Sequence, residues 1–217
     1  MREHKTISIA DQIFEQLERD ILTGKYQRGE VLSELRLSSE LGVSRTPIRE
    51  AVRRLEQENI LKETGRGMVV VGISREDMED MYEIRLHIEG FAARRSAVNI
   101  SDEQLKEMKE SLELQEFYIE KQDGGSSEQI RDLDSRFHEL LYESSGSRTY
   151  QDTLTALHKK IMKYRSASIS KCGRARQSMN EHRAIYQALA AHDPDGAEKA
   201  VTQHALNARD SVTEMEM

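Results

Sequence analysis

Apolar residues recur at helical spacing along most of this chain of 217 residues. In the first amphipathic segment, over residues 8–24, an isoleucine or leucine stands at every fourth position: Ile9, Ile13, Leu17 and Ile21. A shorter helix is predicted over 34–41, and a tight turn at Gly42-Val43 precedes a third helix that begins near Ser44. Two short helices joined by such a turn predict a helix-turn-helix.

The third predicted helix carries two faces of different chemistry. Its first turn holds Pro47, where the missing N–H costs no intrahelical bond, and Ser44 can accept a backbone N–H as the N-cap. Arg45, Arg49 and Arg53 recur every four residues on one face, and apolar residues share another face that would meet a core. A recognition helix in the major groove of DNA requires both faces. A cationic helix face by itself is usually only solvated.

Two short strands are predicted next, over 60–63 and 68–71, on either side of Thr64-Gly65-Arg66-Gly67. A hairpin flanked by glycines can lay its backbone and one cation along a DNA groove. The helix, the helix-turn-helix and the hairpin together predict a winged helix-turn-helix.

Helical periodicity continues almost to the end of the chain, and no alternating strand pattern follows residue 72. Six helices are predicted, over 75–97, 102–122, 128–144, 148–170, 176–192 and 195–213. Ser101 with Gln104 predicts a capping box, and Asp193-Pro194 predicts an N-cap followed by a proline in the first turn. The expected fold is therefore mainly α, with a winged helix-turn-helix over 1–73 and an all-α helical bundle over 74–217.

The formal net charge of −7 is unevenly distributed. Residues 1–73 hold 12 basic and 12 acidic residues, and residues 74–217 hold 20 and 27. Residues 44–54 alone hold four arginines and one glutamate, so a local cationic patch can meet phosphates.

No run approaches about 18 consecutive apolar residues and no secretory signal is visible, so we expect no membrane span. The single cysteine, Cys172, excludes an internal disulfide and fits the cytoplasm.

Four side chains in the second half form a candidate metal site. Asp134 and His138 are four residues apart and share one face of a predicted helix, while His182 and His204 lie on two later helices. Three imidazoles and one carboxylate can bind a divalent transition metal. Spacing alone does not show that histidines on three helices meet.

The run LGVSRTPIREA, over residues 41–51, resembles the signature of the GntR family of bacterial transcription regulators. Gly65-Arg66-Gly67 resembles the tip of the wing in that family, and the resemblance covers residues 8–72. It implies that the residues contacting DNA or shaping the wing are Arg45, Thr46, Arg49, Gly65, Arg66 and Gly67.

The chain departs from the family at Leu35, where members often place an arginine. Arg36 is the next residue, but it points about 100° away on a helix. We therefore expect no DNA contact from this second helix.

The second half resembles the FCD domain, the helical ligand-binding domain of the FadR subfamily of GntR regulators, over about residues 76–213. The motif DSRFH at 134–138, the pair Glu181-His182 and a histidine in the last helix carry the resemblance. It implies that the metal ligands are Asp134, His138, His182 and His204. Zinc or nickel suits this imidazole-rich set, and manganese is compatible with it. The remaining histidines are expected on the surface or in packing, although His87 can reach a pocket: His4, His87, His158 and His192.

Arg85 is a candidate for binding an effector. It precedes Glu89 by four residues and can form an ion pair with it along the helix. The family resemblance instead implies that this arginine points into the cavity and clamps the carboxylate of an organic acid. Arg165 is a second candidate for the same cavity.

The expected function is control of transcription by a ligand. A homodimer would bind a near-palindromic operator as a repressor and respond to a small carboxylate or hydroxy-acid effector. A metal-dependent, hydrolase-like enzyme is an alternative, because a metal held by histidines can activate water. Against it, no motif such as His-Glu-x-x-His supplies a separate general base. A third alternative is a sensor for which the metal itself is the signal.

Overall fold

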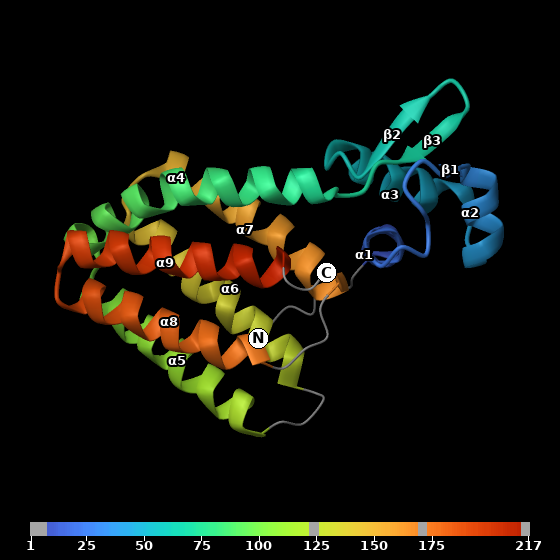
Figure 1. Ribbon diagram of the computed structural model, residues 1–217. Coiled ribbons are helices and arrows are strands. Elements are labelled where there is room, and N and C mark those ends of the chain that lie inside the picture. The colour runs from blue at the N-terminus through green and yellow to red at the C-terminus, as the bar shows by residue number, and fades with distance from the viewer. Residues whose placement is uncertain (1–7, 122–125, 169–172, 214–217) are drawn as a thin grey trace. The chain divides into compact units, whose positions relative to one another are not determined.

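The computed structural model describes residues 8–121, 126–168 and 173–213, so that Cys172 and His4 lie outside the described residues (Figure 1). The chain divides into two compact units, Met1–Ser74 and Arg75–Met217, each with its own hydrophobic core. The fold is mainly helical, as the sequence predicts. None of the helices in the described ranges is long and apolar enough to cross a membrane.

The N-terminal unit is a winged helix-turn-helix. Its elements are α1 (Ile9–Leu22), β1 (Val31–Leu32), α2 (Glu34–Leu41), α3 (Arg45–Gln57), β2 (Leu61–Thr64) and β3 (Gly67–Val70). The strands form an antiparallel sheet in the order β1-β3-β2, in which Val69 faces Val31 on one side and Lys62 on the other. Strand β1 was not predicted, because two residues are too few to show an alternating pattern.

The start of α3 differs from the prediction in one respect. Ser44 occupies the N-cap position, with φ −66° and ψ 161°, but its side chain makes no capping hydrogen bond. The usual donor is the N–H of the third helical residue, and here that residue is Pro47, which has none. In α1 the third residue is Asp11, and Ser8 and Asp11 form a complete capping box.

The core of this unit is built from the predicted helical stripes. Leu17 of α1, Leu37 of α2 and Ile48 and Leu55 of α3 are all fully buried. Burying an aliphatic side chain this completely contributes about 1.5–3 kcal/mol. Ile9, the first helical residue, is 58% exposed, so the buried part of the predicted stripe in α1 consists of Ile13, Leu17 and Ile21.

The C-terminal unit is a bundle of six helices in the described ranges. They are α4 (Arg75–Asn99), α5 (Asp102–Lys121), α6 (Ser126–Ser144), α7 (Arg148–Ser168), α8 (Gly173–Ala190) and α9 (Pro194–Thr213). All six were predicted, with starts within three residues and ends within two. The capping box of Ser101 and Gln104 is present, and the Asp193 carboxylate accepts the Gly196 N–H at 3.0 Å to cap α9.

Within the bundle, α4 lies along α9, α9 along α8, and α5 beside α6 and α8 (Figure 1). Small residues of α4, including Ala92, Ala93 and Ala97, are fully buried and allow a close approach. A Cβ atom added at Gly90 would come within 3.0 Å of Glu198 Cγ on α9. The interior is not wholly apolar, since α6, α7, α8 and α9 each bury a histidine there.

Candidate functional site

The arginine face of α3 is exposed, and it is paired with α2. Arg49 donates through Nε and Nη2 to the two carboxylate oxygens of Glu34, at 2.9 and 3.0 Å. Arg45 Nη2 donates to the same carboxylate at 3.3 Å. The hydrogen bond from Arg49 lowers the pKa of Glu34. Two of the predicted DNA-contacting arginines are thus held side by side, and Thr46 is exposed next to them.

The N-terminus of α3 also offers backbone N–H groups, because no side chain caps it. Such a helix end favours an anion, such as a DNA phosphate. On α2, Leu35 is 69% exposed, while Arg36 is engaged by Glu30 and Glu40 at 2.7 and 2.6 Å.

The wing is the hairpin of β2 and β3, with Arg66 exposed at its tip. Gly67 has φ +123°, and an added Cβ would lie 3.2 Å from the carbonyl oxygen of Leu32, so this position requires glycine. Gly65 has open space around it and no positive φ, so the structure shows no such requirement there.

The buried histidines of the bundle converge on one cluster. His138 of α6, His182 of α8 and His204 of α9 each offer a nitrogen, and these atoms lie within 4.8 Å of one another. His158 of α7 and Asp134 of α6 form a second such group with His138. Asp134 Oδ1 lies 3.8 Å from His182 Nε2, so the four predicted ligands are brought together.

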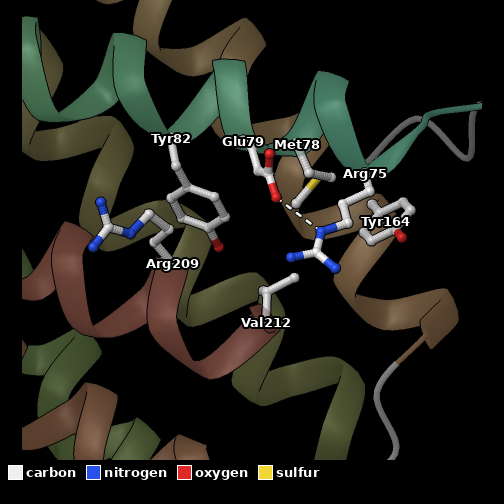
Figure 2. A pocket seen from close by; sticks show the side chains of 7 residues that line it. All are labelled: Arg75, Met78, Glu79, Tyr82, Tyr164, Arg209 and Val212. Atoms are coloured by element: carbon white, nitrogen blue, oxygen red, sulfur yellow. Dashed lines mark hydrogen bonds and ion pairs between the residues drawn. The ribbon is translucent and has the colours of Figure 1, made fainter. Parts of the chain in front are cut away.

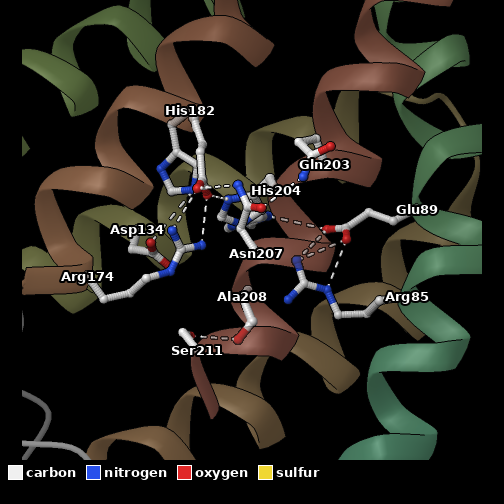
Figure 3. Close-up of polar contacts among 12 residues, drawn as sticks. Arg85, Glu89, Asp134, Arg174, His182, Gln203, His204, Asn207, Ala208 and Ser211 are labelled. Carbon is white, nitrogen blue, oxygen red and sulfur yellow. Dashed lines mark hydrogen bonds and ion pairs between the residues drawn. The ribbon is translucent and has the colours of Figure 1, made fainter. Parts of the chain in front are cut away.

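One carboxylate orients His204. Glu181 Oε2 lies 2.7 Å from His204 Nδ1, and Arg174 and Asn207 donate to Glu181 at 2.7 Å (Figure 3). Although burial opposes it, these hydrogen bonds lower the pKa of Glu181 to about 2. An ionised carboxylate only accepts, so the proton of His204 sits on Nδ1 and its Nε2 keeps a lone pair.

A second carboxylate lies beside His138. Glu89 Oε1 is 3.5 Å from His138 Nδ1 and accepts the Tyr142 hydroxyl at 2.5 Å. Arg85 donates to both oxygens of Glu89, at 2.9 and 3.0 Å, and both side chains are fully buried. Burial opposes ionisation, but the charge of Arg85 holds the pKa of Glu89 well below its usual value. The predicted Arg85–Glu89 ion pair is present, and Figure 3 shows it on the side of the cluster opposite Arg174.

Burial favours the neutral form of three of these imidazoles. It lowers the pKa of His138 to about 3, and it also lowers the pKa values of His182 and His204. Burial alone would raise the pKa of Asp134, but the histidines around it hold that pKa well below its usual value. Both ring nitrogens of His182 are buried with no hydrogen-bond partner among the described residues. These donors fit a divalent metal, which needs unprotonated ligands.

Some residues of this site were not predicted. His158 was expected on the surface or in simple packing, and that expectation misses its place beside Asp134. The sequence carried a signal, because Leu154, His158 and Ile161 follow the spacing of one buried helical face. Arg174 and Tyr142 were also missed, and Glu181 was named only as part of the metal motif, without a role of its own. They act through ion pairs and hydrogen bonds between side chains, which periodicity does not reveal.

Two other predicted positions have different outcomes. His87 is exposed, with its Nδ1 2.8 Å from the carbonyl oxygen of Glu83, so the idea that it reaches a pocket is wrong. Arg165 belongs to α7, but its side chain lies outside the described residues.

Two hollows lie in the helical unit. A cavity of about 20 Å³ between α4, α7 and α9 is lined by Arg75, Met78, Glu79, Tyr82, Tyr164, Arg209 and Val212 (Figure 2). It has room for about one water molecule. A wider depression of about 310 Å³ lies over α8 and α9, and its lining includes Glu181 and His204. The depression thus borders the cluster at His204.

Comparisons with known proteins agree with this architecture. Residues 9–71 match the family described as bacterial regulatory proteins, gntR family, and residues 80–207 match the FCD domain. The HTH-type transcriptional repressor RspR of Escherichia coli (strain K12) is 30% identical over 97% of this chain and 91% of its own length. The gluconate operon transcriptional repressor of Bacillus subtilis (strain 168) is 32% identical over 58% of this chain and 51% of its own. The solved structure of E. coli McbR/YncC shares the fold, with a TM-score of 0.69 and 22% identity, over 97% of this chain and 98% of that one.

Proposed function

The chain belongs to the GntR family of bacterial transcription regulators and carries an FCD domain. From that premise we propose that it is a metal-dependent repressor whose DNA binding is controlled by an organic acid. In this proposal, the winged unit binds operator DNA. The helical unit binds one divalent transition metal and a small carboxylate or hydroxy-acid effector. Relatives named as repressors support the sign of regulation.

DNA binding by α3 is supported by the exposure of Arg45, Thr46 and Arg49 beside an uncapped helix N-terminus. One winged unit reads only a few base pairs, so useful specificity requires two units. We therefore expect a homodimer on a near-palindromic operator. A monomer in solution that occupies DNA as one chain per site would contradict this expectation.

The metal site carries the proposal. Its supporting observation is the burial of neutral histidines from different helices around Asp134, with both nitrogens of His182 left without a hydrogen-bond partner among the described residues. Asp134, His138, His182 and His204 would hold the ion. Zinc or nickel suits these ligands, and manganese is compatible with them. When bound, the ion supplies a fixed positive charge to which an anionic effector can attach.

The effector would meet Arg85 at the edge of this site. The guanidinium group of Arg85 is buried and already pairs with Glu89, so an acid must either share the guanidinium or replace Glu89 as its partner. Either change alters the buried contacts between α4 and α6, because Glu89 also binds Tyr142. Gluconate, which appears in the name of one relative's operon, is a hydroxy acid of the class proposed here.

The test begins with the metal content of the purified protein. We expect one divalent ion per chain, and loss of that ion in the double variant His182→Ala/His204→Ala. His87→Ala is the matched control, because His87 is an exposed histidine of the same unit. Full retention of metal by the double variant would show that the ligands lie elsewhere.

Operator binding then separates the alternatives. Small organic acids are titrated against the operator complex of the metal-loaded and metal-free protein. A shift in DNA affinity with an acid supports the proposal. A shift with metal alone would identify a metal sensor, and turnover of an added ester or amide would identify an enzyme.

A further inference from the structure

His158 of α7 is a buried histidine that the proposed metal site does not use. Its side chain is 5% exposed, and neither ring nitrogen has a hydrogen-bond partner among the described residues. Buried polar atoms in folded proteins are almost always paired. Two unpaired nitrogens on one ring therefore point to a partner other than the neighbouring side chains.

The ring of His158 lies against the proposed ligands. Its Nε2 is 3.5 Å from Asp134 Oδ2, beyond the usual N–H···O length of about 2.9 Å, and its centroid is 4.3 Å from that of His138. The ligand atoms of Asp134, His138 and His158 are as close to one another as those of the other group, within 4.8 Å. The oxygens of Asp134 thus face different histidines, Oδ2 toward His158 and Oδ1 toward His182.

The two groups share His138, and this limits the number of ions. A neutral imidazole has one nitrogen lone pair, so His138 can bind one ion and not two. We propose, resting on the metal site of the proposed function, that His158 is a fifth side chain bound to a single ion. The full set would be Asp134, His138, His158, His182 and His204.

This fifth ligand changes what the effector can do. Five protein ligands leave one open position on a six-coordinate ion, whereas four leave two. The effector then attaches through a single oxygen, and protein side chains must recognise the rest of it. A chelating hydroxy acid accordingly has no advantage over the corresponding simple acid.

The test uses the full chain loaded with Co²⁺, together with His158→Phe, which keeps a ring but removes both nitrogens, and His158→Ala. His87→Phe is the control at an exposed histidine. The affinity for cobalt is measured by competition with a chromogenic chelator. Ligated histidines are counted in the proton NMR spectrum from the exchangeable ring N–H signals that the cobalt shifts. We expect one cobalt per chain, four such signals in the unaltered protein and three in both His158 variants, with affinity lower by roughly tenfold or more.

Acetate and glycolate are the probes for the open position. Both should bind the unaltered cobalt protein equally, and glycolate should gain over acetate in His158→Ala, where a second position opens. Three signals in the unaltered protein, or full affinity in His158→Phe, would overturn the inference, as would two cobalt ions per chain or a preference for glycolate in the unaltered protein. Failure of the unaltered protein to bind cobalt would remove the proposed metal site itself.

Discussion

Individual carboxylates set the chemistry of the buried histidines. Glu181 fixes the proton of His204 on Nδ1, and Glu89 lies beside the corresponding nitrogen of His138. Each carboxylate is held in turn by a buried arginine, Arg174 or Arg85. Ligand orientation in this bundle thus depends on residues that would not touch the ion.

Glu181→Gln tests this dependence. The amide keeps the shape of the side chain but loses the charge that orients His204 and pairs with Arg174. Metal affinity should fall by roughly 10- to 100-fold, as is usual when an outer partner of a metal ligand is removed. Competition with a chelator measures the change, with Glu113→Gln as the control at an exposed glutamate. Equal affinity in both variants would show that Glu181 does not orient the site.

The same histidines make the stability of the metal-free protein depend on pH. The pKa of His138 is lowered to about 3, and those of His182 and His204 are lowered as well. Below about pH 6.5, these histidines bind protons in the unfolded chain but not in the folded chain. Their contribution to the free energy of unfolding is therefore complete above that pH and is lost as the pH falls. It should fall toward pH 3 by up to about 1.4 kcal/mol per pH unit for each histidine.

Urea unfolding of metal-free protein between pH 7 and pH 5 measures this slope. His182→Phe should reduce the slope by the share of one histidine, while His87→Gln should leave it unchanged. A stability that stays constant from pH 7 to pH 5 would mean that these histidines are not buried as neutral rings in the metal-free protein.

At the scale of helices and strands, an ion pair joins α2 to α3, the helix that we propose reads DNA. Glu34 of α2 holds Arg45 and Arg49 of α3 in a shared ion pair that is open to solvent. The pair keeps the two guanidinium groups on one side of α3. Its carboxylate also repels the phosphates that these arginines would meet.

Arg45→Ala and Arg49→Ala should each lower operator affinity by roughly tenfold, because a bidentate contact to a base or a charge on a phosphate is lost. Glu34→Gln should strengthen binding to unrelated DNA and thereby reduce the ratio of operator affinity to affinity for unrelated DNA. Fluorescence anisotropy across a salt series measures both effects, with Arg75→Ala as a control at an exposed ion pair outside the winged unit. Unchanged operator affinity in both arginine variants would remove α3 from the contact.

The elements themselves could be predicted because each signal was local. Apolar spacing located the nine long or medium helices of the described ranges, and Ser101 with Gln104 marked a helix start. β1 was missed because its pairing with β3 is a tertiary contact between short segments. The cap expected at Ser44 is absent because Pro47, the third helical residue, has no N–H to donate.

For the whole molecule, the predicted ligands came from a family resemblance, since helical spacing cannot show that separate helices converge. The bundle brings Asp134 and His138 together with His182 and His204, which lie on two other helices. His158 could not be assigned in this way, because a histidine on an apolar face has the same pattern whether it packs or binds a metal. Convergence of side chains is therefore the information that only the fold supplies.

Coupling between effector and DNA is a property of the whole molecule, and Arg85 is the residue at which to test it. Arg85→Ala alone would leave Glu89 buried without its partner, which typically destabilises a protein by about 3–5 kcal/mol. The double variant Arg85→Met/Glu89→Gln removes both charges and keeps the volume. It should bind the operator as the unaltered protein does. It is studied saturated with metal, because the loss of the Glu89 carboxylate beside His138 should lower metal affinity.

In that double variant, organic acids should no longer shift operator affinity. The unaltered protein should show a shift of about 1–3 kcal/mol, the usual size of coupling between two sites. Titrating the acids against the labelled operator complex measures the coupling, and a metal-free sample of the unaltered protein shows how much of it passes through the ion. If an acid shifts operator affinity equally in all three samples, it binds at a place that involves neither Arg85 nor the metal. Because linkage is reciprocal, operator DNA should then also change the affinity for the acid by the same factor. Measuring that change would show that the acid is coupled to DNA binding from this other site.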